Sequence, residues 1–97
     1  MSASLSTHVL DTAAGGPATG VTVELLHGDE LVARAETDAD GRARLSDALA
    51  LGRYRLVFHP PSEFFRRVEY ELELEADRHY HVPLLVSPFS CTSYRGS

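Results

Sequence analysis

The strongest constraint on the fold is an alternation of apolar and polar residues that returns along most of the chain. Leu5, Thr7 and Val9 share one face of an extended strand, because successive side chains of a strand point to opposite sides. The same period of two returns in four later segments, at residues 21–25, 31–36, 53–58 and 68–75. No segment shows a sustained helical period. The alternation therefore predicts a chain built of strands.

Turn signals separate the strands. The stretch HGDE at 27–30 is typical of a hairpin, and DADG at 38–41 of a turn that places Gly41 at positive φ. HYHVPLLV at 79–86 is expected to be the last long strand. PPSEFFRR at 60–67 has room for a single helical turn, with Ser62 as its N-cap. Short strands at intervals of roughly 8–12 residues predict an all-β sandwich with at most one short helix.

The length of 97 residues predicts one domain spanning residues 1–97. A chain of this size buries roughly 60–65% of the surface that its unfolded form exposes. Such a core leaves little depth for a private pocket. We therefore expect a site that is shallow or shared between subunits.

The charge balance narrows the class of partner. Fourteen acidic residues against nine basic ones give a net charge of −5, which argues against binding to nucleic acid or to an anionic membrane. The single cysteine, Cys91, cannot form an intrachain disulfide, which is typical of cytosolic proteins. The sequence shows no signal peptide and no apolar run near the ~20 residues that cross a bilayer. We expect a soluble, cytoplasmic protein.

Two clusters have residue types that bind metals. Residues 36–47 place acidic side chains at several positions of a calcium loop, but the flanking segments are strands, so a β-turn that positions Arg42 is the preferred interpretation. His79 and His81 lie about 7 Å apart on one strand face and can chelate zinc, with His8 as a third ligand. Partly buried histidines with satisfied hydrogen bonds are the alternative.

Two further candidates lie near the C-terminus. Cys91 beside a histidine is a candidate thiolate nucleophile, although a lone cysteine is more often a small buried apolar residue. In the tail, Arg95 and the carboxylate of Ser97 bring opposite charges together, and Gly96 allows a sharp bend between them. A disordered tail and a subunit contact both remain open.

Several motifs together resemble one family. STHVLD, GPATGVTVEL, TDADGR, HYHVPLLVSP and above all the terminal YRGS are similar to the 5-hydroxyisourate hydrolases of the transthyretin-like family, over essentially the whole chain. The pair HYHVPLL and YRGS is highly specific, whereas GPATGVTVEL with TDADGR also occurs in carboxypeptidase-regulatory-like modules. In two places the chain departs from the family: HPPSEFFRR is abbreviated where a short helix is usual, and Cys91 occupies a tyrosine-like position.

The resemblance implies a fold, an assembly and a reaction. The fold is a prealbumin-like sandwich of two four-stranded antiparallel sheets, and the assembly is a homotetramer with active sites shared between subunits. The reaction is hydrolysis of 5-hydroxyisourate to 2-oxo-4-hydroxy-4-carboxy-5-ureidoimidazoline in urate degradation, with no cofactor and no metal. The resemblance implies catalytic roles for His8, Arg42, His81 and Ser97. It implies substrate-binding roles for His8, Arg42, Tyr94, Arg95, Gly96 and Ser97.

The chemistry suggests a role for each of these groups. His81 and His8 have ordinary pKa values near 6.5, so their neutral forms can activate water, and the sequence does not say which is the base. Arg42 offers a fork of donors for carbonyl oxygens or a developing oxyanion. The Ser97 hydroxyl and carboxylate are expected to orient a histidine or the water. A zinc hydrolase using His8, His79 and His81, and a non-catalytic binding module, remain the alternatives.

Overall fold

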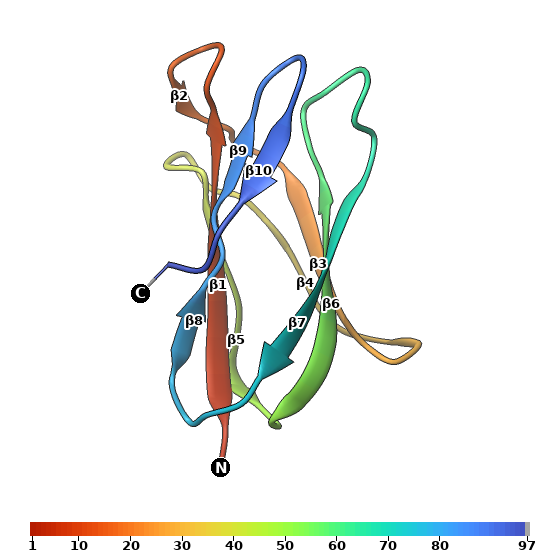
Figure 1. Ribbon diagram of the computed structural model, residues 1–97. Helices are drawn as coiled ribbons and strands as arrows, with labels where there is room; N and C mark the ends of the chain where they lie inside the picture. The colour runs from red at the N-terminus through yellow and green to blue at the C-terminus, as the bar shows by residue number, and fades with distance from the viewer. Residues whose placement is uncertain (97) are drawn as a thin grey trace.

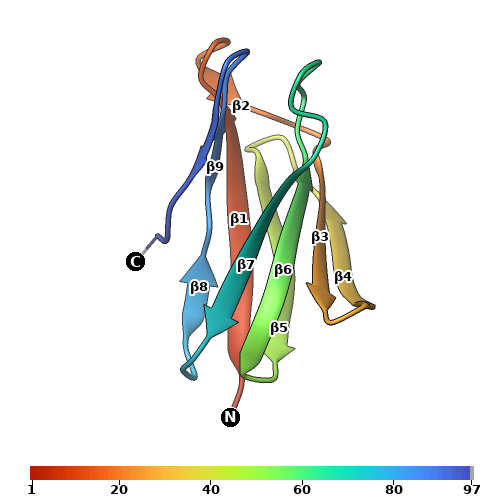
Figure 2. The same ribbon diagram turned by 45° about the vertical axis from the view of Figure 1, so that its right-hand side comes forward.

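The computed structural model describes residues 1–96, and these form two β-sheets packed face to face, with no helix in that range (Figure 1). The sheet that contains β1 is called the first sheet, and the other the second sheet. The second sheet has the strand order β4-β3-β6-β7, with β3 (Thr22–His27), β4 (Glu30–Glu36), β6 (Gly52–His59) and β7 (Val68–Leu74). The first sheet contains β1 (Ala3–Asp11), β2 (Gly16–Pro17), β5 (Arg42–Leu49), β8 (His79–His81), β9 (Leu84–Val86) and β10 (Cys91–Ser93). Figure 2 shows the two layers side by side. The predicted all-β sandwich is confirmed.

The first sheet differs in detail from two four-stranded antiparallel sheets. β1 pairs antiparallel with β5 on one side and parallel with β8 and β9 on the other, so the sheet is mixed. The expected long strand at 79–86 is divided at Pro83, because proline has no N–H to donate to a sheet ladder. If β8 and β9 are taken as one interrupted strand and the two-residue β2 is set aside, this sheet also has four strands.

β1 has one apolar face and one polar face, as the alternation predicts. Leu5, Thr7 and Val9 are fully buried between the sheets, where each large apolar side chain contributes about 1.5–3 kcal/mol relative to exposure. Facing them from the second sheet are buried residues that include Leu56 and Phe58. Ser4, Ser6 and His8 therefore lie on the outer face of the sandwich, and Thr7 is the polar residue of β1 on the inner face.

Thr7 holds the interrupted strand in place against β1. Its buried hydroxyl donates to the carbonyl oxygen of Val82 at 2.6 Å, and the Val82 N–H donates to the carbonyl of Ser6 at 3.0 Å. The Ser93 hydroxyl donates to the carbonyl of Pro83 at 2.8 Å. The bonds from Thr7 and Val82 keep the β8 to β9 segment aligned with β1 across the proline, and the Ser93 bond ties it to β10.

The turns also follow the sequence signals. The β3–β4 hairpin closes with His27 paired to Glu30, and Gly41 has a φ of 77°. The expected helical turn at 60–67 is absent, although the Ser62 hydroxyl accepts hydrogen bonds from the N–H groups of Phe64 and Phe65. Ser62 therefore closes a bend without starting a helix. No helix that could cross a membrane occurs in the part of the chain that the structure describes.

Replacing Gly41 by alanine should destabilise the fold well beyond the cost of the backbone conformation alone. A Cβ at this position would lie 2.5 Å from the Val9 carbonyl oxygen and 2.9 Å from the Pro17 side chain. Gly15→Ala is the matched control, because Gly15 has nearly the same φ of 76° and no atom within 4 Å of the added Cβ. We expect about 1–2 kcal/mol for Gly15→Ala and clearly more for Gly41→Ala in urea unfolding. Equal costs would contradict the role of close packing here.

Candidate active site

A polar groove of about 680 Å³ lies on the outer face of the first sheet. Strands β5, β1 and β8 are neighbours in the sheet (Figure 1), and they and the segment after β10 contribute residues to the groove. Its lining includes Ser6, Arg42, Arg44, His79, His81 and Gly96. Strand register explains this gathering, since Ser6 of β1 lies opposite Arg44 on one side and opposite His81 on the other.

The turn before β5 positions Arg42. The Asp38 carboxylate accepts hydrogen bonds from the N–H groups of Asp40 at 2.9 Å and Arg42 at 3.0 Å. The bond from the Arg42 N–H is the main reason that the pKa of Asp38 lies below its ordinary value. The acidic cluster at 36–47 therefore includes a turn that presents Arg42, which confirms the β-turn interpretation.

His8 lies opposite Arg42 in the β1–β5 register, and the same turn orients its ring. Its Nε2 lies 2.8 Å from the carbonyl oxygen of Asp40. Because a carbonyl oxygen only accepts hydrogen bonds, Nε2 must carry the proton, which assigns the tautomer. In the neutral ring the lone pair is then on Nδ1.

His81 is held on two edges of its ring. Its Nδ1 lies 2.9 Å from the Ser6 hydroxyl. Burial is the largest cause that lowers the pKa of His81 below its ordinary value, followed by the positive charge of Arg42 and the nearby His79 and His8. His81 is therefore neutral at pH 7, with its ring at the groove.

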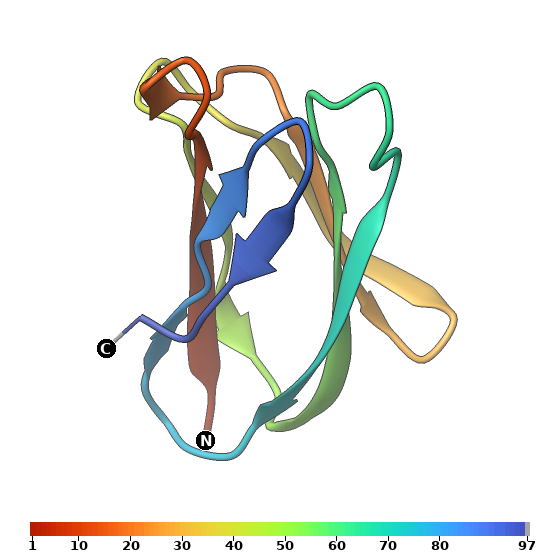
Figure 3. The same ribbon diagram turned by 45° about the horizontal axis from the view of Figure 1, so that its top comes forward.

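The tail after β10 covers the other edge of this ring. The Gly96 N–H donates to the His81 carbonyl at 2.7 Å, and a Cβ on Gly96 would lie only 3.0 Å from Cδ2 of His81. Figure 3 shows the tail crossing beside β1 toward β8. A side chain at position 96 would push against the His81 ring, so the absence of a Cβ lets the backbone pass.

The structure does not gather all the expected tail residues in this groove. Tyr94 is 55% exposed and lines the groove. Arg95 lines a separate pocket of about 300 Å³, which Tyr94 and residues of β7 also line. Ser97 lies outside the described residues. The binding roles expected for Arg95 and Ser97 therefore stay predictions.

The alternative chemistries receive little support from the geometry. Within residues 1–96 no group of three or more His, Cys, Asp or Glu side chains is arranged to hold a metal ion. Cys91 packs against the hydrophobic core, and burial raises the pKa of its thiol. A raised pKa keeps the thiol protonated, which disfavours a thiolate nucleophile.

Sequence reasoning missed two contributors to the groove, Ser6 and Asp38. Asp38 was detectable, because an aspartate at the first position of a turn often accepts hydrogen bonds from the backbone N–H groups that follow. Ser6 was not, since its link to His81 joins positions 75 residues apart and depends on the parallel pairing of β1 with β8.

Comparisons with known proteins agree with this fold. The family model described as the HIUase/Transthyretin family matches residues 5–96. A 5-hydroxyisourate hydrolase of Caulobacter vibrioides is 41% identical, over 96% of this chain and 97% of its own. The structure of Klebsiella pneumoniae 5-hydroxyisourate hydrolase superposes with a TM-score of 0.87 at 37% identity, and the match covers all of both chains. Sea bream transthyretin, solved with thyroxine, gives a TM-score of 0.78 at 25% identity over 95% of this chain and 93% of its own.

The environment of His81 can be tested by titration. We expect the NMR-detected pKa of His81 to lie below 6.5, the ordinary value for histidine. Arg42→Gln removes a positive charge that opposes the imidazolium, so it should raise the pKa of His81. Arg53→Gln, an exposed arginine of β6 paired with Glu73, is the matched control and should leave it unchanged. An unchanged pKa in Arg42→Gln would contradict the coupling.

Proposed function

The chain belongs to the HIUase/Transthyretin family, and we propose that it is a 5-hydroxyisourate hydrolase of urate degradation. Its product would be 2-oxo-4-hydroxy-4-carboxy-5-ureidoimidazoline. The observation that carries the proposal is the pair of His81 and Arg42 at one polar groove, in a chain that matches named hydrolases over its whole length.

The groove has the chemical groups that the reaction needs. The substrate is a planar ring with several carbonyl oxygens, and hydrolysis adds water to one of them. The neutral imidazole of His81 would take a proton from this water, and His8, which lies opposite Arg42 in the strand register, would assist the proton transfer. The Arg42 guanidinium would bind carbonyl oxygens and stabilise the negative charge that develops as water attacks.

The tail would complete the binding site. Tyr94 and Gly96 border the groove, and the Gly96 N–H donates to the carbonyl oxygen of His81. We also propose substrate-binding roles for Arg95 and Ser97, together with a catalytic role for Ser97 in orienting a histidine or the water. For these two residues the support is the resemblance of the YRGS motif alone.

We further propose that the protein forms a homotetramer with active sites shared between subunits. We also propose that it is cytoplasmic, which cell fractionation would test. The sandwich measures 39 × 24 × 19 Å, and the groove lies open on its outer face. A neighbouring copy would close the groove and exclude water from the reacting ring.

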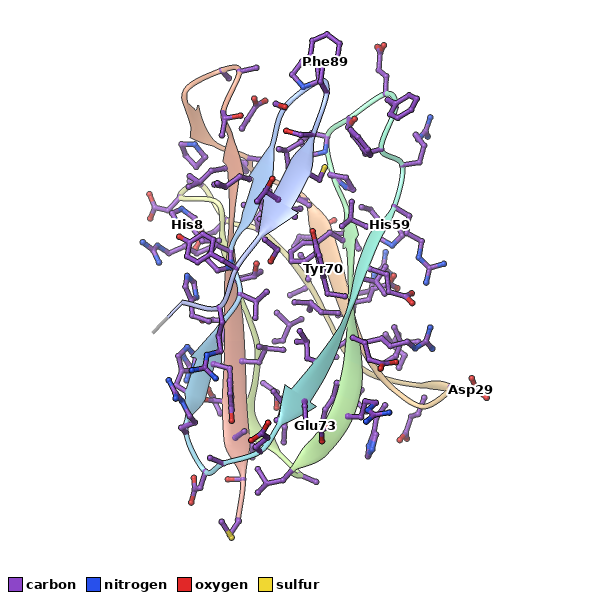
Figure 4. All side chains as sticks on the ribbon, in the orientation of Figure 1. His8, Asp29, His59, Tyr70, Glu73 and Phe89 are labelled. Carbon is purple, nitrogen blue, oxygen red and sulfur yellow. The ribbon has the colours of Figure 1, made fainter. Side chains whose placement is uncertain are left out.

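The activity test uses 5-hydroxyisourate made from urate with urate oxidase. The protein should speed the decay of its absorbance above the spontaneous rate. His81→Asn should lower kcat/KM by about 10²–10⁴-fold, the usual contribution of a general base. His59→Asn is the control, because His59 lies on the opposite side of the sandwich from His8 and bonds to Glu24 (Figure 4). Decay at the spontaneous rate with wild-type protein would refute the proposed activity.

The assembly is tested by light scattering on the protein as it elutes from a sizing column. We expect a mass close to that of four 10.6 kDa chains. A monomer that retains full hydrolase activity would contradict a site shared between subunits.

A further inference from the structure

Four side chains beside the groove form one continuous line of hydrogen bonds. The Ser6 hydroxyl lies 2.9 Å from Nδ1 of His81 and 2.8 Å from Nε2 of His79. Nδ1 of His79 lies 2.6 Å from the Ser4 hydroxyl. The parallel register causes this alternation, because β1 sets Ser4 beside His79 and Ser6 beside His81. The line therefore runs from the groove along the outer face of the sheet.

This line can carry protons in either direction. A hydroxyl donates one hydrogen bond and can accept another, and a neutral imidazole has one donor and one acceptor nitrogen. In one direction Nδ1–H of His81 donates to Ser6, Ser6 donates to Nε2 of His79, and Nδ1–H of His79 donates to Ser4. In the reverse direction every bond is inverted. The first direction leaves a lone pair on Nε2 of His81, and the second leaves a proton there.

His8 lacks this freedom. Its Nε2 donates to the Asp40 carbonyl, which has no proton to return, so its tautomer is held. The partner of His81 is a hydroxyl, which serves equally as donor and acceptor. Nε2 of His81 also has no hydrogen-bond partner among residues 1–96. Of the two histidines, His81 is thus the one that can change its tautomer.

Electrostatics make such a change of tautomer useful. Burial and the positive charge of Arg42 both disfavour the imidazolium form of His81. A base that simply took a proton from water would become a cation beside that guanidinium. A base that gains a proton on Nε2 while it loses one from Nδ1 stays neutral, and the cost of that cation is avoided.

We propose that Ser6 and His79 are positioning residues that form a proton relay for His81, an inference that rests on the proposed hydrolase function. As the water oxygen bonds to the ring carbonyl carbon, a water proton moves to Nε2 of His81. One proton then passes from Nδ1 to Ser6, from Ser6 to Nε2 of His79, from Nδ1 of His79 to Ser4, and from Ser4 to solvent.

The second half of the reaction returns the relay to its first direction. The ring C–N bond breaks, and the leaving nitrogen takes the proton from Nε2 of His81. Nδ1 regains a proton from Ser6, and the line is refilled from solvent at Ser4. The new carboxylic acid then ionises, so the net reaction consumes one water and releases one proton. Ser4 is half-buried and His79 beside it is exposed, so the outer end of the relay reaches water.

The test compares Ser6→Ala with Ser6→Thr, which keeps the hydroxyl. Ser6→Ala should lower kcat by on the order of 10–100-fold, the range known for outer partners of metal-bound histidines, with KM nearly unchanged. Ser6→Thr should restore most of the loss. Ser46→Ala, which removes a hydroxyl of β5 bonded only to the Ala48 N–H, is the matched control and should retain wild-type kcat.

Two readouts separate a relay from a merely structural serine. Nitrogen NMR should show the wild-type His81 proton on Nδ1, and Ser6→Ala should move it toward Nε2. The second readout is the rate measured in mixtures of H₂O and D₂O. When the rate is plotted against the fraction of D₂O, the wild type should give a curve, as expected when several protons move together. Ser6→Ala should give a straight line. If Ser6→Ala fails to fold, His79→Phe is the second variant: it replaces the imidazole with a flat ring that cannot transfer protons, and it should show the same loss of kcat and the same linear dependence.

Failure of the relay can be distinguished from failure of the proposed hydrolase function. Wild-type kcat and an unchanged tautomer in Ser6→Ala would overturn the relay while leaving the hydrolase activity intact. Loss of kcat in Ser6→Ala that Ser6→Thr does not restore would also overturn it. If the wild type does not speed the decay of 5-hydroxyisourate, the proposed function has failed, and the relay as a catalytic device fails with it.

Discussion

The pairing of β1 with a strand on each side is the interaction on which the rest of this structure depends. β5 joins it in antiparallel register, and β8 and β9 join it in parallel. A residue in the middle of a sheet has two neighbours at the same level, so groups from three separate segments meet. This places Ser6 between Arg44 and His81. Two residues further along the same face of β1, His8 lies opposite Arg42.

The same strand also separates the stabilising groups from the reactive ones. Its inner residues, Leu5, Thr7 and Val9, have no exposed surface, while Ser6 on its outer face lines the groove. Thr7 connects the two roles, because its buried hydroxyl holds Val82 and thereby fixes His81 one residue earlier. A rigid sheet places the side chains of the candidate site more exactly than a loop would, since its backbone bonds set their spacing.

Hydrogen bonds and electrostatics distinguish His81, which lines the groove, from His8, which lies opposite Arg42 in the β1–β5 register. His8 bonds to a carbonyl, whereas His81 bonds to a hydroxyl and lies in a field that disfavours its cation. A neutral imidazole beside a guanidinium suits a reaction in which a base and an anion-stabilising group must act on one small ring. The proposed function draws on this combination.

Much of this protein was determined by the sequence alone. The period of two and the turn residues predicted a sandwich, and local chemistry predicted the Asp38–Gly41 turn that positions Arg42. These features depend on neighbours in the chain, so local patterns reveal them. The parallel pairing of β1 with β8, the bond between Ser6 and His81 and the contact of Gly96 with that ring were decided only by the tertiary structure. Strand order and register arise from packing between distant segments, and no local pattern of residues encodes which strands become neighbours.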